Sequence, residues 1–141
     1  MAYCTQDDIL NLLNETALIQ LTDDDGAGEI DTDKVTRAIA DADATIDAYC
    51  QDRYSVPLSP VPPKIRQISV DIAAYNLYSR SDLPMPDVRS DRNKEAIRFL
   101  EKVADGRIKL GAETPSPANT DNTVDVVSNT RIFSREKMSG F

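Results

Sequence analysis

The sequence predicts a mainly α-helical fold, and three observations support this prediction. Apolar residues recur at steps of three and four over several stretches, which places them on one side of a helix. The prolines and glycines lie between these stretches or at their ends, where they stop helices and form turns. Of the 141 residues, 40% are hydrophobic, enough to build a real core. We therefore expect a small helical bundle with extended loops.

The first helical stretch follows Thr5. Thr5 and Asp8 have the spacing of a capping box, with Asp in place of the usual Glu or Gln. We expect this helix to turn four large apolar residues inward: Ile9, Leu10, Leu12 and Leu13. A second short apolar segment, 17–21, comes soon after it and precedes an acidic loop over 22–31.

The clearest helix in the sequence begins after this acidic loop. Thr32 is expected to cap it, and Asp33 then lies favourably at the positive end of the helix dipole. The pattern stops near Arg53. Its apolar stripe has a residue at each three- or four-residue step: Val35, Ala38, Ile39, Ala42, Ile46, Tyr49 and Cys50.

Four prolines then predict an extended connection, because proline lacks the amide hydrogen that a helix needs. They are Pro57, Pro60, Pro62 and Pro63, and the last of them is well placed to start the next long helix. The core side of that helix is expected to comprise Ile65, Ile68, Ile72, Tyr75 and Leu77, widened by Val70, Ala73 and Ala74.

After a loop over 81–87, a last helix is expected over 88–104. Its inner side is predicted to be Ile97, Leu100, Val103 and Ala104, and Gly106 ends it. Beyond Gly111 the composition shifts to Thr, Ser, Pro and Asn, which is typical of a linker. We therefore divide the chain into a helical domain, 1–110, and an extended C-terminal arm, 111–141.

Two interpretations of the arm remain open. Residues 124–126 alternate like a short strand and could pair with 131–133, so that the arm folds back as an edge β-hairpin. Alternatively, the basic, partly apolar end of the arm becomes ordered on a partner, which we favour. The candidate partner-binding residues are Arg131, Ile132, Phe133, Arg135, Lys137 and Phe141.

The charge of the chain argues against several classes of function. There are 16 Lys and Arg against 24 Asp and Glu, a formal net charge of −8. An acidic surface repels nucleic acid and anionic lipid, so free-standing DNA binding is not expected. No apolar run approaches the roughly 20 residues of a membrane span. The first residues also lack the pattern of a secretory signal, so we expect a chain made in a cytosol.

Catalytic chemistry has little support in the sequence. The chain contains no histidine, which excludes Ser–His and Cys–His nucleophile pairs. Cys4 and Cys50 show no metal-binding spacing. Cys50 lies on an apolar stripe and is expected to be a buried free thiol, and Cys4 is expected to be buried or neutral. The few glycines form no phosphate-binding loop. We expect neither an enzyme nor a cofactor or metal site.

The acidic loop partly imitates a calcium-binding EF-hand loop. Aspartates stand at the first and third positions, glycine at the sixth and isoleucine at the eighth: Asp23, Asp25, Gly28 and Ile30. However, the fifth position is Ala27, which has no side-chain oxygen, and the twelfth is Lys34, where a bidentate glutamate is required. A solvated turn that leads into the next helix is the better explanation.

A series of short segments runs along most of the chain and carries a family resemblance. They are Tyr3-Cys4-Thr5, 18–23, Ile30-Asp31, 40–49, Arg53-Tyr54, Pro57-Leu58, Val61-Pro62-Pro63, Asp71-Ile72-Ala73, 75–78, 96–100, Gly106 and the ending 131–141. None carries a catalytic signature, and their order and joint occurrence are what is characteristic. In these segments the chain resembles the small Mu-like phage and prophage proteins that occupy the head–tail joint.

The resemblance implies a structural protein of the virion neck, made in the cytoplasm of the bacterial host. Such a head–tail connector, or adaptor, docks as a ring on the portal protein, extends the DNA channel and provides the surface for tail attachment. It implies a homo-oligomeric ring of about twelve copies. The expected partners are the portal and other neck or tail-terminator proteins, while DNA passes through the lumen without specific binding.

Other functions remain open from the sequence alone. A cytosolic helical protein-interaction module unrelated to phage would be a stable monomer with an ordered C-terminus. A weak calcium-binding module would show a melting temperature that depends on the metal. A carboxylate-based hydrolase is more distant, because it would need buried, paired acids, and none of the predicted inner faces carries one.

Overall fold

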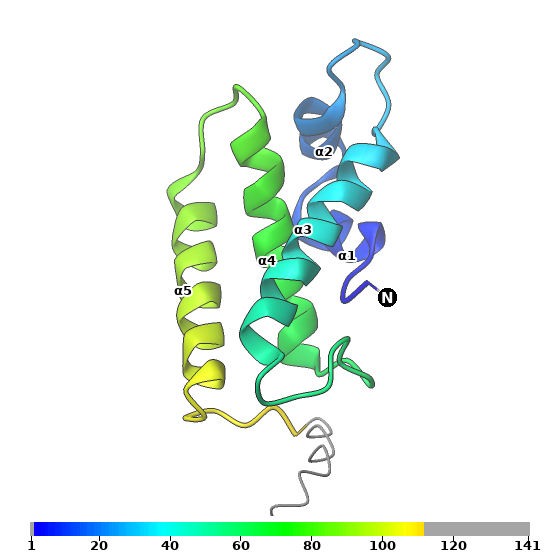
Figure 1. Ribbon diagram of the computed structural model, residues 1–141. Coiled ribbons are helices and arrows are strands. Elements are labelled where there is room, and N and C mark those ends of the chain that lie inside the picture. Colours follow the sequence, from blue (N-terminus) through cyan, green and yellow to red (C-terminus); the bar gives the residue numbers. More distant parts are fainter. Residues whose placement is uncertain (1, 112–141) are drawn as a thin grey trace, which may run out of the picture.

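In the part of the chain that the structure describes, three long helices form the body, and they run antiparallel to their neighbours (Figure 1). The computed structural model describes residues 2–111, and the fold of this part is mainly helical, as predicted. In chain order the elements are α1 (Gln6–Leu12), α2 (Glu15–Thr22), α3 (Thr32–Cys50), α4 (Pro63–Arg80) and α5 (Asp87–Ala104). α3, α4 and α5 pack against one another, while α1 and α2 pack mainly on α4. The predicted C-terminal hairpin lies outside the described residues.

The N-terminal ends of the first three helices are set by short polar side chains. The predicted capping box is present, because Thr5 Oγ1 accepts from Asp8 N and the Asp8 carboxylate accepts from Thr5 N at 2.9 Å. Asn14 Oδ1 accepts from Ala17 N at 2.7 Å at the start of α2. The prediction for α3 was wrong by one residue: Asp31 is its cap, and Thr32 is its first helical residue. An aspartate carboxylate accepts amide hydrogens at least as well as a threonine hydroxyl.

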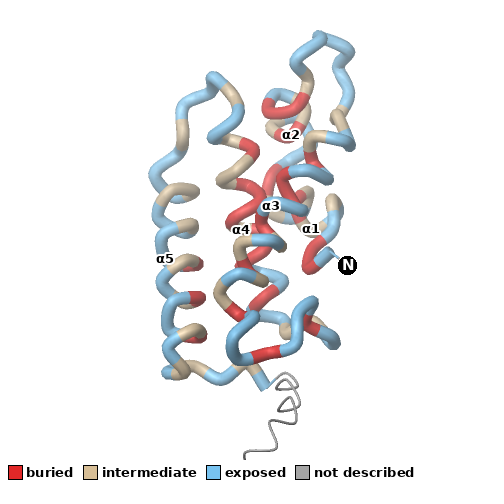
Figure 2. Tube along the Cα trace, viewed as in Figure 1, coloured by how far each residue is buried: buried red, intermediate tan, exposed pale blue. Residues whose placement is uncertain are grey.

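The core lies between α3 and α4 and is closed by α5 on one flank (Figure 2). Most of the predicted stripe residues are buried, including Ile46, Ile65 and Leu100 at 0% exposure. Six residues predicted to face inward are only partly buried: Leu10, Leu12, Tyr49, Tyr75, Ile97 and Ala104. Ala96, which was not predicted, is buried instead of its neighbour Ile97. The buried side of α5 is therefore rotated slightly from the side that the sequence predicted. This is because α5 packs against both α3 and α4, and the two neighbours together determine which of its residues are buried.

The connection over 51–62 is anchored at two points. Tyr54 and Leu58 are buried among the core residues, and Tyr54 Oη accepts a hydrogen bond from Leu110 N at 3.0 Å. Arg53 Nε donates to Ala104 O at 2.6 Å, across the end of α5. The last described residues are thus held under the same end of the bundle as the proline-rich loop. Any partner contact made by residues 112–141 starts from this end.

Within residues 2–111, none of the helices has the length and apolarity needed to cross a membrane. α3 and α5 expose charged residues along their outer sides, and α4 is interrupted by charged residues at intervals. The helices are amphipathic and bury their apolar sides against each other.

Candidate functional site

The N-terminal segment is held against α3 by a network of polar groups around Tyr3. Tyr3 N donates to both oxygens of the Asp43 carboxylate at 3.3 Å. The Tyr3 hydroxyl donates to Asp47 Oδ1 and accepts from Leu58 N at 2.9 Å. Burial, together with the hydrogen bond to Asp47, raises the pKa of Tyr3, so the phenol remains a donor at neutral pH. One side chain thereby joins the N-terminus, α3 and the proline-rich loop.

Cys4 and Ser69 extend this network to α4. Ser69 Oγ lies 3.1 Å from Asp43 Oδ1, to which it donates, and 3.1 Å from Cys4 Sγ. Burial raises the pKa of the Cys4 thiol to about 11 and that of Cys50 to about 11. Both cysteines are free and buried, as predicted. At neutral pH these thiols stay protonated, so they pack as small apolar groups and are weak nucleophiles.

A groove runs beside this network, along the side of α3 that carries the N-terminal segment. We call it the acidic groove. Its volume is about 640 Å³, and its only charged lining residues among the described part of the chain are Asp43 and Asp47. Burial raises the pKa of Asp43. The lining consists of Ala2, Cys4, Thr5, Gln6, Val35, Thr36, Ile39, Ala40, Asp43, Ala44, Asp47 and Pro57.

A second groove lies between α4 and α5, and no residue of α3 lines it. We call it the basic groove. Its volume is about 470 Å³, and four cations line it against two carboxylates: Lys64, Arg92, Arg98 and Lys102 against Asp71 and Glu95. The other lining residues are Gln67, Ile68, Ala96, Phe99 and Ile108. Lys64 Nζ stands 5.5 Å from the centre of the Phe99 ring, a cation–π contact.

Asp71 is the most enclosed charge of the basic groove. Arg92 Nη1 approaches Asp71 Oδ1 at 3.5 Å, and only 11% of the Asp71 side chain is exposed. Burial raises the pKa of Asp71, while Arg92 opposes that shift. Since Asp71 and Arg92 largely neutralise each other, the free charge of this groove comes mostly from Lys64, Arg98 and Lys102.

The two grooves reflect an uneven distribution of charge along the chain. Residues 2–62 contain 13 acidic against 3 basic residues, a formal balance of −10. Residues 63–111 contain 7 acidic against 10 basic residues, a balance of +3. Figure 1 places α5 at one edge of the molecule and the N-terminal segment at the other. One flank is therefore acidic and the opposite flank basic, although the whole chain is acidic.

Sequence comparison identifies the family to which this helical protein belongs. The model of the family described as "Bacteriophage Mu, Gp36" matches residues 3–128, most of the chain. The chain belongs to the bacteriophage Mu Gp36 family. It is therefore a Mu-like phage protein, which agrees with the resemblance inferred from its short segments.

Two relatives extend this assignment. The "Mu-like prophage FluMu protein gp36" of Haemophilus influenzae is 34% identical over 116 residues, which is 82% of this chain and 80% of the relative. "Gene product J" of Escherichia phage Mu is 31% identical over 144 aligned positions, covering 100% of this chain and 99% of the relative. The Gp36 resemblance thus covers the helical body and the residues that follow it.

The acidic loop of this Gp36 protein is held together by its own cations. Lys34 Nζ lies 2.8 Å from Asp24, 3.1 Å from Asp31 and 2.9 Å from Thr22 O, and Arg80 pairs with Asp24 at 2.6 Å. The Asp23 carboxylate accepts from Gly28 N at 2.7 Å and Ala27 N at 2.9 Å. Of the two carboxylates in the EF-hand-like pattern, that of Asp23 is thus bonded to backbone donors of its own loop, and no cluster suited to a metal ion occurs within residues 2–111. These contacts favour the solvated turn over the calcium-binding alternative.

The partner-binding residues predicted from the sequence lie outside the described residues: Arg131, Ile132, Phe133, Arg135, Lys137 and Phe141. The structure contains two grooves that the sequence analysis did not predict. The charge imbalance between residues 2–62 and 63–111 was a signal available in the sequence. The grooves themselves could not be predicted from the sequence, because each is lined by segments that are distant along the chain.

Proposed function

We propose that this Gp36 protein is a structural protein of the phage neck, a head–tail connector. In this role it docks as a ring on the portal, extends the DNA channel and provides the surface for tail attachment. The observation that carries the proposal is the family match over residues 3–128, together with alignment to nearly all of a phage Mu gene product. Small phage proteins that join larger assemblies act through their surfaces, and this chain offers contact surfaces on two flanks.

The helical body has properties that suit a ring subunit. Tyr3, Tyr54 and Arg53 tie the N-terminus and the long connection to the bundle, so the body presents fixed surfaces to its neighbours. Gly111, the last described residue, lies at one end of the bundle, and in this proposal residues 112–141 reach another molecule from there. A rigid core with one long arm can hold a position in a ring while it binds a second component.

The charge of the protein supports passage of DNA through such a ring. Many copies with a net charge of −8 create a strongly negative field, which repels phosphate. In this proposal DNA moves through the lumen without specific contacts. The protein works by contact and not by catalysis, it needs no cofactor, and its partners are the portal, other neck or tail-terminator proteins, and further copies of itself.

The C-terminal arm is proposed to make the portal contact. Its end combines three cations with apolar residues: Arg131, Ile132, Phe133, Arg135, Lys137 and Phe141. The test is co-sedimentation of the purified protein with cognate portal rings, comparing the full chain with a chain truncated after Gly111. Stoichiometric binding by the full chain that disappears on truncation would support both the connector role and the arm contact.

The other outcomes separate these two parts of the proposal. Binding that survives truncation would keep the connector role and move the portal contact to the helical body. No binding by a folded full-length chain, offered its own portal over a range of salt concentrations, would refute the connector role. A triple variant, Arg131→Glu, Arg135→Glu and Lys137→Glu, tests the arm by charge without removing it.

A further inference from the structure

We propose that copies of this chain associate head to tail, with the α5 side of the basic groove of one copy seated on the acidic groove of the next. The inference rests on the proposed function, because it assigns the subunit contact of the ring. Its partner is a second copy of this chain. The argument depends on the position, charge and shape of the two grooves.

The position of the grooves allows repeated association. The basic groove is lined by residues of α4, α5 and the segment after α5, and the acidic groove by the N-terminal segment, α3 and Pro57. They share no residue, so one copy can use both at once. A contact between two different patches is heterologous, and it generates a ring when the rotation between copies closes. A twofold dimer would need one self-complementary patch instead.

The charges of the grooves are complementary. The basic groove has four cations against two carboxylates, whereas the acidic groove has two carboxylates and no Lys or Arg among its described lining residues. Asp47 uses one oxygen for Tyr3, and its Oδ2 accepts no hydrogen bond within residues 2–111. Arg98 and Lys102 of the basic groove are exposed and make no ion pair in that same part of the chain. These groups are available to each other across an interface.

The shapes of the two surfaces also fit. Along the acidic groove, α3 presents small exposed residues four positions apart: Thr36, Ala40 and Ala44. Rows with this spacing form the shallow grooves into which the ridges of another helix pack, and small side chains permit a close approach. On α5, Arg98 and Lys102 are also four positions apart and form such a ridge. Their aliphatic stems can cover the alanines while their charged ends reach Asp43 and Asp47.

The experiment uses two charge variants of the full chain, alone and mixed. The first variant, Arg98→Glu with Lys102→Glu, makes the ridge acidic. The second, Ala40→Lys with Ala44→Lys, adds two cations to the groove, which offset the charges of Asp43 and Asp47. Both aspartates stay in place because they hold the N-terminus. At every contact, the first variant alone sets its glutamates against Asp43 and Asp47, and the second variant alone sets its added lysines against Arg98 and Lys102. In a mixture in which the two variants alternate, the introduced glutamates face the introduced lysines at one contact, and the next contact joins two wild-type surfaces.

The readout is carbodiimide cross-linking, which joins a carboxylate to an amine at contact distance. Wild-type protein is expected to give intermolecular products that link Lys64 or Lys102 to Asp43 or Asp47, located by mass spectrometry. Each variant alone is expected to lose about tenfold or more of the yield of cross-linked oligomers, and the equimolar mixture to recover it. The measurement is made with the protein alone and with portal rings.

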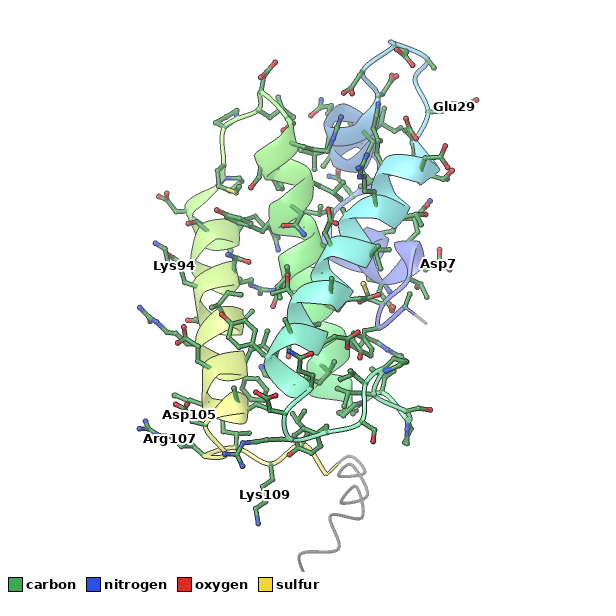
Figure 3. The ribbon with its side chains drawn as sticks, viewed as in Figure 1. Asp7, Glu29, Lys94, Asp105, Arg107 and Lys109 are labelled. Atoms are coloured by element: carbon green, nitrogen blue, oxygen red, sulfur yellow. The ribbon has the colours of Figure 1, made fainter. Side chains whose placement is uncertain are left out.

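A matched control distinguishes the effect of losing the contact from the effect of changing the net charge. Arg107→Glu with Lys109→Glu changes the charge by the same amount as the first variant, and both residues point away from the body outside the basic groove (Figure 3). This control is expected to cross-link as the wild type does. Circular dichroism melting of every variant verifies that each is folded. Should a glutamate variant fail to fold, Arg98→Gln with Lys102→Gln replaces it, with a smaller expected loss.

The outcomes distinguish this inference from the connector role. Folded variants that cross-link as well as the wild type, or a mixture that does not recover, would overturn the head-to-tail contact even if portal binding is intact. Wild-type protein that shows the expected cross-links but never sediments with portal would support the contact and refute the connector role. Wild-type protein without intermolecular cross-links in either setting would overturn the contact.

Discussion

Tyr3 shows how a single side chain can organise a small helical body. Its ring is buried, at 2% exposure, and its hydroxyl lies between a carboxylate of α3 and a backbone amide of the connection over 51–62. The amide of Leu58 is itself buried and has this hydroxyl as its acceptor. Buried polar groups of this kind are costly when one partner is removed.

The first prediction concerns this hydroxyl. Tyr3→Phe keeps the ring but leaves Leu58 N without its acceptor, so the free energy of unfolding should fall by about 1–3 kcal/mol. Urea denaturation followed by circular dichroism measures the change. Tyr75→Phe is the matched control, because the Tyr75 hydroxyl makes no hydrogen bond within residues 2–111. Equal effects of the two substitutions would contradict a structural role of the Tyr3 hydroxyl.

Asp24 shows how the exposed acidic loop is held at its base. The carboxylate pairs with Arg80 at 2.6 Å and with Lys34 at 2.8 Å, and these contacts lower its pKa from 3.8 to about 2. Arg80 also donates to Leu21 O, so the loop is tied to the end of α4. The ion pairs connect segments that are far apart in the sequence.

The second prediction is the pH dependence of this contribution. Since the pKa is lower in the folded chain than in the unfolded chain, the ionised carboxylate stabilises the fold above about pH 4. That stabilisation is lost as the pH falls from about 4 toward 2. Asp24→Asn should therefore destabilise the protein at neutral pH, and its difference from the wild type should disappear near pH 2. Urea denaturation over a pH series, with Asp25→Asn as control, measures this, and a pH-independent difference would be evidence against it.

At the scale of the helix, α5 is terminated by Gly106, the glycine that the sequence predicted to end it. Gly106 has φ of 78°, Gly106 N donates to Val103 O at 3.0 Å, and Arg107 N donates to Lys102 O at 2.9 Å. These two bonds form a Schellman motif, which satisfies carbonyl groups that the helix leaves free. A Cβ at Gly106 would lie 2.6 Å from the Arg53 guanidinium carbon. Glycine is therefore required at this position for two reasons. The backbone is left-handed, and the Arg53 side chain lies where a Cβ would be.

The third prediction distinguishes the cost of the left-handed backbone from the cost of displacing Arg53. Gly106→Ala and Gly28→Ala both place alanine at positive φ, which costs about 1–2 kcal/mol. Gly28 has open space around it, whereas at Gly106 the Arg53 side chain must also move and lose its bond to Ala104 O. Thermal unfolding should show the larger destabilisation for Gly106→Ala. Equal destabilisation by the two substitutions would mean that Arg53 adjusts without loss.

The whole molecule combines an acidic half and a basic half around one core. Among the residues that the structure describes, that core extends from Tyr3 to Leu110 and includes the partly buried Ile108. We predict that the stability of this core does not depend on residues 112–141. The proposed partner contacts, in contrast, use the arm and the two grooves, so binding and stability should respond to different substitutions.

The fourth prediction tests this separation. A chain truncated after Gly111 should unfold in one cooperative transition whose Tm lies within about 4 °C of the full chain, less than a 1 kcal/mol change would produce. Differential scanning calorimetry measures both proteins. A considerably larger decrease would show that the arm packs on its own body, which is the edge-hairpin alternative left open by the sequence. The result also indicates whether loss of portal binding on truncation reflects contact or unfolding.

The helices and most of the core could be predicted from the sequence, because their signals are local. The capping box at Thr5, the stripe from Val35 to Cys50 and the helix start at Pro63 depend on residues a few positions apart. The cap at Asp31 was missed in favour of Thr32, since adjacent residues with similar capping ability differ only in backbone geometry. The inward position of Ala96 was missed because α5 packs against two helices.

The sequence by itself determined the fold class, the approximate helices, the buried free thiols and the family of this protein. The tertiary structure alone decided that Tyr3 joins α3 to Leu58, that Lys34 and Arg80 neutralise Asp24, and that two grooves of opposite charge lie on different flanks. The physical reason is the range of the interactions involved. Helix periodicity and capping act over three or four residues, whereas a groove or a polar network joins side chains that only the packing of helices brings together.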